Sequence, residues 1–356
     1  MMGFDLMRKD VWCMSAFPNI LGNEELREHL SRDVRAGTLS HAYIIEGPKG
    51  CGKHTLAREI AAALSCEHAR DTSMTLPCTL CLPCRKILGG KSPDVITIGR
   101  EDGKAQLGVD VIRNMREDVR LLPNDLDVKV YIIEDAHTMN IQAQNAFLLT
   151  LEEPPKFVVF LLLCESAQPM LETIKSRAPI LRMRPLGQDV LRDSLVEHNA
   201  DARALSKNDP EEFEEILKLS NGFMGQAIEL LDAKRREPRL AARHLAKEFL
   251  LYLTERKSGR RSIDILGSFS QKREEIREQL SEIESAARDL VVIKKCENAP
   301  LCFFTGEDEA AELSFKFKTS ALIAVIEAAG RAKARLAGNA NVRLTLYALA
   351  IDCGLL

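Results

Sequence analysis

One short segment constrains the fold of this 356-residue chain more than any other. An apolar run over 42–45 is followed at once by a glycine loop over 47–53, and a helical pattern follows over 56–64. The G-x-x-x-x-G-K spacing between a strand and a helix places backbone N–H groups and a helix amino terminus around one phosphate-sized hollow. The segment therefore predicts a nucleotide loop in an α/β domain. The loop residues expected to line the hollow are Gly47, Gly50, Gly52 and Lys53.

The first half of the chain alternates short apolar runs with amphipathic segments. This alternation is typical of repeated βα units, so we expect a mostly parallel sheet with helices on both faces. Aromatic residues make up only 5% of the chain, which favours a core of aliphatic side chains between helices and a sheet. The runs expected to form strands are 42–45, 95–98, 128–133, 158–164 and 180–183.

The pattern divides the chain into three predicted domains. The strand-like runs end near 185, so the α/β domain is expected over 1–185. A small helical domain is expected over 186–237, with helix breaks at 208–210 and 221–222. The remainder, 238–356, has helical patterns only, and we expect an all-helical third domain.

Charge and hydropathy argue against a protein that binds nucleic acid through its overall charge and against a membrane-spanning protein. Lys and Arg total 49 against 52 for Asp and Glu, a net charge of −3, so bulk attraction to nucleic acid is not indicated. No apolar run approaches the roughly 20 residues of a membrane span, and we expect a cytoplasmic protein that does not contact membranes. A basic cluster over 234–247 is consistent either with a local phosphate contact or with a solvated domain junction.

The predicted nucleotide site departs from a hydrolytic one at several positions. His54 stands where a Ser or Thr hydroxyl would hold magnesium, and Thr55 lies about 100° further around the helix. After the run 128–133, Glu134 precedes Asp135, whereas a hydrolytic site of this type has Asp first and Glu second. We expect weak or absent binding of ATP or ADP; the loop is then a structural relic, and the two carboxylates simply cap the strand.

Four cysteines have the spacing of a metal centre. Cys66, Cys78, Cys81 and Cys84 form C-x11-C-x2-C-x2-C within an inserted loop over 66–84. Four thiolates supply a tetrahedral zinc site that stabilises a loop too short and polar to build its own core. We expect structural zinc with no open position for catalysis. Reduced surface thiols and an iron–sulfur cluster are the alternatives.

The order of these features resembles the AAA+ clamp-loader subunits of bacterial DNA polymerase III. The resemblance covers about 20–235 with specific motifs and extends more weakly into the carboxy-terminal helices. Beside the nucleotide loop and the cysteine insertion, the segments that carry it are 40–43, 129–136, 144–146, 151–155 and 173–177.

This resemblance implies an AAA+ domain, a small helical lid and a helical collar domain that mediates oligomerisation. It also implies assembly with gamma/tau and delta subunits into a pentamer that opens the sliding clamp and places it on primed DNA. In this family a Ser-Arg-Cys motif presents an arginine finger to ATP held by a neighbouring gamma/tau subunit. Ser176 and Arg177 match that motif, while Ala178 replaces the cysteine. The alternative is that Arg177 is an ordinary surface residue.

Further departures from the family concern ATP use and DNA contact. The segment 163–165 lacks the hydroxyl residue that senses the γ-phosphate, and Gly225 or Gln226 occupies the place of the second sensor arginine. Leu149 replaces the usual Lys of a helix near DNA. Together with His54, these changes favour a non-hydrolysing subunit. An ATP-hydrolysing gamma/tau-type motor is the first alternative, and a stand-alone nucleotide- or zinc-dependent module is the second.

Overall fold

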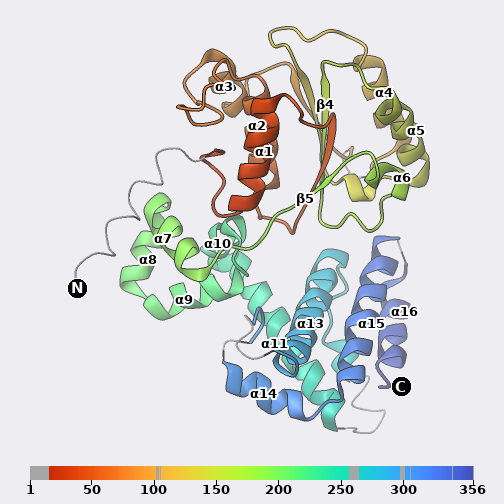
Figure 1. Cartoon of the computed structure of the whole chain (residues 1–356). Helices are drawn as coiled ribbons and strands as arrows, with labels where there is room; N and C mark the ends of the chain where they lie inside the picture. The colour runs from red at the N-terminus through yellow and green to blue at the C-terminus, as the bar shows by residue number, and fades with distance from the viewer. Residues whose placement is uncertain are drawn as a thin grey trace. The chain divides into compact units, whose positions relative to one another are not determined.

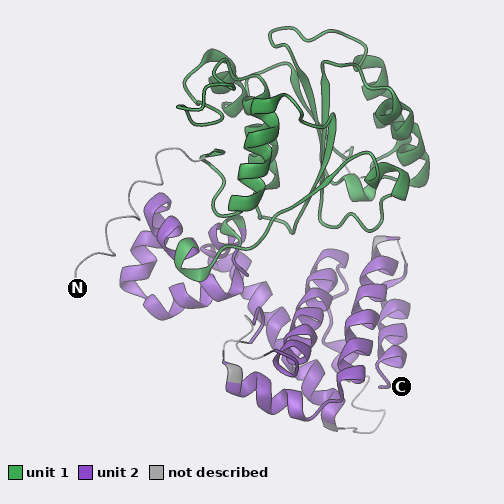
Figure 2. Cartoon of the chain, in the orientation of Figure 1, with its two compact units in different colours: residues 1–190, 223–225 green, residues 191–222, 226–356 purple. Residues whose placement is uncertain are grey.

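The computed structural model describes residues 16–101, 104, 106–255, 264–296, 301–304, 306–338 and 340–355. The chain divides into two compact units (Figure 2). The first unit comprises 1–190 together with 223–225, and the second comprises 191–222 together with 226–356. Figure 1 labels the helices and strands of both units.

The first unit is built on a five-stranded sheet in which every pair of neighbouring strands is parallel. The strand that leads into the glycine loop lies near the middle of the sheet. In spatial order the strands are β2 (Val95–Ile98), β3 (Lys129–Ile133), β4 (Val158–Cys164), β1 (Ala42–Glu46) and β5 (Ile180–Arg182). The five expected strand runs are therefore confirmed to within two residues at each end.

Helices cover both faces of this sheet, as Figure 1 shows. Because neighbouring residues of a strand point to opposite faces, Tyr43 and Ile45 pack in one apolar core while Ala42 and Ile44 pack in the other. The first core contains α1 (Glu24–Ala36), α2 (Lys53–Leu64) and α3 (Leu82–Leu88). The second contains α4 (Val109–Asp118), a short 3₁₀ helix (Ala136–Thr138), α5 (Ile141–Glu152) and α6 (Glu172–Lys175).

The second unit is entirely helical over its described residues. Asp209 accepts a hydrogen bond from the backbone N–H of Glu212, with Pro210 in the first helical position, so the expected helix break at 208–210 is confirmed. Its helices are α7 (Gln188–His198), α8 (Ala200–Asn208), α9 (Pro210–Leu219), α10 (Met224–Leu230), α11 (Ala233–Glu255), α13 (Arg273–Ile293), α14 (Glu307–Phe315), α15 (Thr319–Ala337) and α16 (Val342–Asp352). The start of α7 and the first two residues of α10 are assigned to the first unit.

The fold class expected from the sequence is confirmed: a parallel α/β unit precedes an all-helical region. The division into three domains stays a prediction. Its second boundary, between 237 and 238, falls inside the continuous helix α11. Among the described residues, no helix combines the length and the apolar character needed to cross a membrane.

A buried carboxylate holds the chain before β3. Asp94 is fully buried, and its two carboxylate oxygens accept hydrogen bonds from the backbone N–H groups of Asn124, Asp125 and Leu126 at 2.6, 2.7 and 2.9 Å. Burial alone would raise the pKa of Asp94, but these donors outweigh it and hold the pKa below its ordinary value. The ionised carboxylate therefore stabilises the fold.

We predict that Asp94→Asn lowers the free energy of unfolding by about 2 kcal/mol at neutral pH, because the amide turns an N–H group toward N–H donors. The Asp94 contribution is complete above the unfolded-state pKa of about 3.9 and is lost as the pH falls through the lower folded-state pKa. The difference between wild type and variant should shrink over that interval. Urea unfolding followed by circular dichroism measures it, with the exposed Asp110→Asn as the control.

Candidate functional site

The carboxyl ends of three parallel strands bring the predicted nucleotide residues together. The glycine loop follows β1, Glu134 follows β3, and Cys164 ends β4, which lies between them. The backbone N–H of Gly47 donates to the carbonyl oxygen of Cys164 over 3.1 Å, which joins the loop to the central strand. This edge of a parallel sheet is where ligands of α/β proteins bind.

The glycine loop has the backbone conformation expected of a nucleotide loop. Its lysine, Lys53, is hydrogen-bonded to carbonyl oxygens of the same loop. Gly50 and Gly52 have φ angles of 77° and 96°, a region that favours glycine. The Lys53 ammonium donates to the carbonyl oxygens of Gly47 and Pro48 over 2.6 and 2.8 Å. A phosphate bound here would have to compete with these two acceptors.

Gly225, one of the two positions at which the sequence analysis placed the missing sensor arginine, packs directly on the loop. Its N–H donates to the Gly50 carbonyl oxygen over 3.0 Å. A Cβ at this position would lie 2.7 Å from that oxygen and 2.8 Å from the Gly50 Cα. Both neighbours are backbone atoms, so an arginine cannot replace Gly225 without displacing the loop.

The two acidic residues after β3 each lie close to a nitrogen-bearing side chain of the same chain. A Glu134 carboxylate oxygen lies 3.5 Å from Nδ1 of His54, the residue at the expected hydroxyl position. Asp135 pairs with Arg100 over 2.9 Å. Thr55, the nearest hydroxyl on α2, is exposed. The carboxylates that a magnesium site would need are thus brought to the loop, where Asp135 forms an ion pair with Arg100 and Glu134 lies beside the His54 ring.

The last residue of β4, at the first sensor position, offers a thiol in place of a hydroxyl. Cys164 is buried, and burial, reinforced by the nearby Glu46 carboxylate, raises the pKa of its thiol to about 12. The thiol is therefore neutral at physiological pH. It is a poor replacement for a hydroxyl that hydrogen-bonds a phosphate oxygen.

Arg177 lies beyond α6 at the surface of the first unit. One terminal nitrogen pairs with the Glu152 carboxylate over 3.2 Å, and the other donates to the Thr173 carbonyl oxygen over 3.1 Å. The Arg177 side chain is 37% exposed. Ala178, where the family has cysteine, is fully buried.

A buried amide fixes the segment that carries Arg177. Gln144 on α5 donates to the carbonyl oxygen of Met139 over 3.0 Å and accepts from the N–H of Leu171 over 2.8 Å. It also donates to the Pro169 carbonyl oxygen over 3.4 Å. These bonds tie the start of α5 to the start of α6. Sequence analysis named Gln144 as part of a motif without assigning this role.

The predicted metal centre is brought together, with one additional donor. Cys66, His68, Cys78 and Cys81 place one ligand atom each within 4.8 Å of all the others. The sulfur of Cys84 lies 3.9 Å from the sulfur of Cys78. The chain thus offers five candidate donors for four tetrahedral positions. The Cys66-x-His68 spacing was the signal that sequence reasoning missed.

The chemistry of these donors fits a soft divalent metal. Burial alone would raise the pKa of the Cys78 thiol, but the backbone N–H groups of Cys81 and Leu80 donate to it and lower the pKa to about 6. A thiolate is the form that binds zinc. The Cys84 thiol also lies 3.6 Å from the Ala62 carbonyl oxygen on α2, which places the cluster against the helix that starts at the glycine loop. The four-cysteine ligand set stays a prediction.

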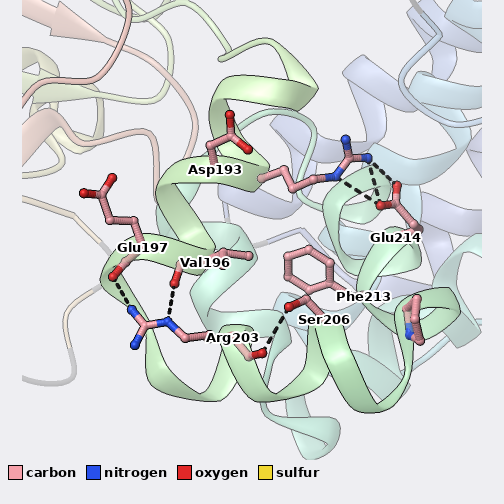
Figure 3. A pocket seen from close by; sticks show the side chains of 9 residues that line it. Asp193, Val196, Glu197, Arg203, Ser206, Phe213 and Glu214 are labelled. Carbon is pink, nitrogen blue, oxygen red and sulfur yellow. Dashed lines mark hydrogen bonds and ion pairs between the residues drawn. The ribbon is translucent and has the colours of Figure 1, made fainter.

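A cavity lies away from these residues, in the second unit. It has a volume of about 490 Å³ and is lined by α7, α8 and α9. Figure 3 shows Arg203 turned back toward the carbonyl oxygens of Val196 and Glu197, while Glu214 is engaged by Arg192. None of the residues singled out from the sequence lines this cavity.

The basic cluster over 234–247 is largely neutralised within the chain. Arg236 pairs with Glu212, and Lys247 pairs with Glu309. Arg239 and Arg243 both face the buried carboxylate of Glu282. These ion pairs favour a structural role for the cluster over a phosphate contact.

Comparisons with known proteins find similarity to subunits of DNA polymerase III. Residues 22–187 match the family model described as DNA polymerase III, delta subunit. The chain is 34% identical over 216 residues to the DNA polymerase III subunit tau of Bacillus subtilis, covering 61% of this chain and 37% of that protein. It is 31% identical over 222 residues to subunit tau of Escherichia coli, covering 62% of this chain and 33% of that protein. The chain spans about a third of the length of these two curated relatives.

One solved structure is also similar to this chain at a low level. The gamma-subunit-related protein of DNA polymerase III from Thermotoga maritima is 19% identical, with a TM-score of 0.38, and the match covers 92% of this chain and 98% of that one. The family match lies within the α/β unit, whose parallel five-stranded sheet with helices on both faces has the fold class expected from the sequence.

We predict that the protein as purified binds zinc and that Cys78→Ser weakens zinc binding. Losing a residue that only hydrogen-bonds to a metal ligand costs roughly 10- to 100-fold in affinity, and we expect the loss of a ligand itself to cost more. A hydroxyl replaces a thiolate ligand in that variant. Metal analysis by mass spectrometry measures the zinc content, and a thermal melt with and without chelator reports its effect on stability. Cys353→Ser, in the second unit, is the control.

Two results would contradict this prediction. Metal-free protein that melts at the same temperature as the metal-loaded protein would favour four reduced thiols. Iron together with visible absorption would favour an iron–sulfur cluster.

Proposed function

We propose that this chain is a delta prime-type stator subunit of the bacterial DNA polymerase III clamp loader. It assembles with gamma/tau and delta subunits, and the assembly loads the sliding clamp onto primed DNA without ATP hydrolysis by this chain. Similarity to tau subunits over 61% of the chain supports membership of the assembly. The observation that carries the absence of hydrolysis is the pairing of His54 with Glu134 at the nucleotide loop.

This pairing removes the geometry that hydrolysis needs. Magnesium takes oxygen ligands, and an imidazole nitrogen replaces the required hydroxyl at position 54. Phosphoryl transfer depends almost entirely on positioning and on electrostatic stabilisation. Glu134 and Asp135 have the reversed order and are held by His54 and Arg100, so neither is placed to hold magnesium or to orient water.

The surface position of Arg177 supports a role in trans. A guanidinium is always charged and recognises phosphate through a planar fork of N–H groups. Arg177 lies on the segment after α6, which Gln144 fixes to α5, and its side chain is partly exposed. It is therefore available to a γ-phosphate held by a neighbouring gamma/tau subunit.

The second candidate function is an ATP-hydrolysing motor of gamma/tau type. The names of the curated relatives and the intact Gly47, Gly52 and Lys53 favour it. The absence of an arginine at Gly225 or Gln226 weighs against it, and at position 225 the close approach to Gly50 leaves no room for a side chain. In either role the zinc centre is structural, since four protein ligands leave no open position for catalysis.

We predict that the isolated chain shows no steady-state ATP hydrolysis. Calorimetric titration with ATP and magnesium should give weak or no binding, because the loop lacks the hydroxyl ligand. His54→Thr restores that ligand and releases Glu134, so binding should strengthen. Hydrolysis by the wild-type chain that Lys53→Ala abolishes would instead establish the motor.

We predict that Arg177→Ala lowers clamp-stimulated ATP turnover in a complex reconstituted with gamma/tau and delta. An arginine finger contributes roughly 10³- to 10⁵-fold in related phosphoryl-transfer enzymes, so the nucleotide site served by Arg177 should become nearly silent. Arg113→Ala removes an exposed arginine of α4 and is the matched control. Unchanged turnover would remove the role assigned to Arg177.

A further inference from the structure

We propose that Glu152 is an intramolecular substitute for the phosphate that Arg177 binds in the assembled loader. In the free chain its carboxylate engages the guanidinium, and a nucleotide held by the neighbouring subunit must displace it. This inference rests on the proposed function, because it requires that Arg177 acts on a phosphate in trans.

The contacts of Arg177 define the resting arrangement. Glu152 is the last residue of α5, and its carboxylate oxygen lies 3.2 Å from one terminal nitrogen of Arg177. The other terminal nitrogen donates to the Thr173 carbonyl oxygen over 3.1 Å. Both ends of the guanidinium fork are therefore occupied by acceptors of the same chain.

Carboxylate and phosphate compete for the same guanidinium. Both are anions with oxygen atoms that match the Arg fork, so each can take the place of the other. A nucleotide phosphate carries more negative charge than the single carboxylate of Glu152. The exchange is therefore favourable once a neighbouring subunit brings its nucleotide within reach of Arg177.

Exposure sets the size of the effect. The side chains of Arg177 and Glu152 are 37% and 50% exposed, so their ion pair is screened by water and salt. An exposed ion pair of this kind contributes little free energy. It shifts the equilibrium between the paired and the released Arg177 by about fivefold at most. Glu152 therefore biases Arg177 toward the resting position without preventing its release.

The release of Arg177 leaves the supporting joint intact. Gln144 lies at the other end of α5 and is buried, and it holds the segment before α6 through backbone groups that do not involve Glu152. Opening the ion pair changes one exposed contact only. Removing Glu152 should therefore change the availability of Arg177 and not the fold.

The test uses the complete loader reconstituted with gamma/tau and delta subunits. With the Glu152→Gln variant, clamp- and DNA-stimulated ATP turnover should rise by up to about fivefold at low salt, because the competing charge is gone. The increase should shrink at high salt, where the wild-type pair is already screened. Gel filtration should show the same assembly for both proteins.

Two matched variants isolate the effect. Glu153→Gln removes the same charge from the next residue, which has no ion pair with Arg177, and should leave turnover unchanged. Adding Arg177→Ala to Glu152→Gln should abolish the increase, because the released group is then absent.

Each other outcome overturns the proposal in a distinct way. Lower turnover with Glu152→Gln means that Glu152 orients Arg177 for catalysis rather than competing for it. Unchanged turnover, in a loader that Arg177→Ala silences, means that the ion pair is incidental while the proposed function stands. If Arg177→Ala has no effect either, the role in trans and the inference fail together.

Discussion

The structure of the candidate site depends on one constraint, the parallel order of β1, β4 and β3. Parallel strands place their carboxyl ends at the same edge, so the glycine loop, Cys164 and Glu134 must lie close together whatever their side chains are. The fold therefore keeps the outline of a nucleotide site even where individual residues have changed. The side chains at this edge determine whether the site can bind magnesium and a phosphate. At this edge, His54 and Arg100 satisfy the two carboxylates, and backbone carbonyls satisfy Lys53.

The cysteine insertion illustrates a different constraint. The loop over 66–84 contains several turns and exposes Leu80 and Leu82, and its buried side chains are the four cysteines, Leu76 and Pro77. A bound metal would supply the cross-links that a small core cannot. Because Cys84 also contacts the Ala62 carbonyl oxygen, the centre would stabilise the end of α2 as well as the insertion. That helix begins at Lys53, so the cysteine cluster and the glycine loop lie at opposite ends of α2.

The elements were more predictable than the contacts between them. The strands, the helical character of the region after 238 and the break before Pro210 follow from local apolar period and capping residues, which sequence shows directly. The packing of Gly225 on Gly50 joins residues 175 positions apart, and no local pattern indicates that a side chain is excluded there. His68 was missed for the related reason that a histidine two residues after a cysteine has many other uses. The pairing of Arg239 and Arg243 with Glu282 likewise depends on how two helices meet.

The same reasoning explains how a chain can lose one half of an ATPase site and keep the other. The ligands for a nucleotide in cis lie at the carboxyl ends of β1 and β3. Arg177 depends instead on the joint between α5 and α6, which Gln144 holds from within the second apolar core. Since the two sets share no side chain, substitutions such as His54 change the first without disturbing the second. A subunit that no longer hydrolyses ATP is therefore still able to present a charged group to the nucleotide of its neighbour.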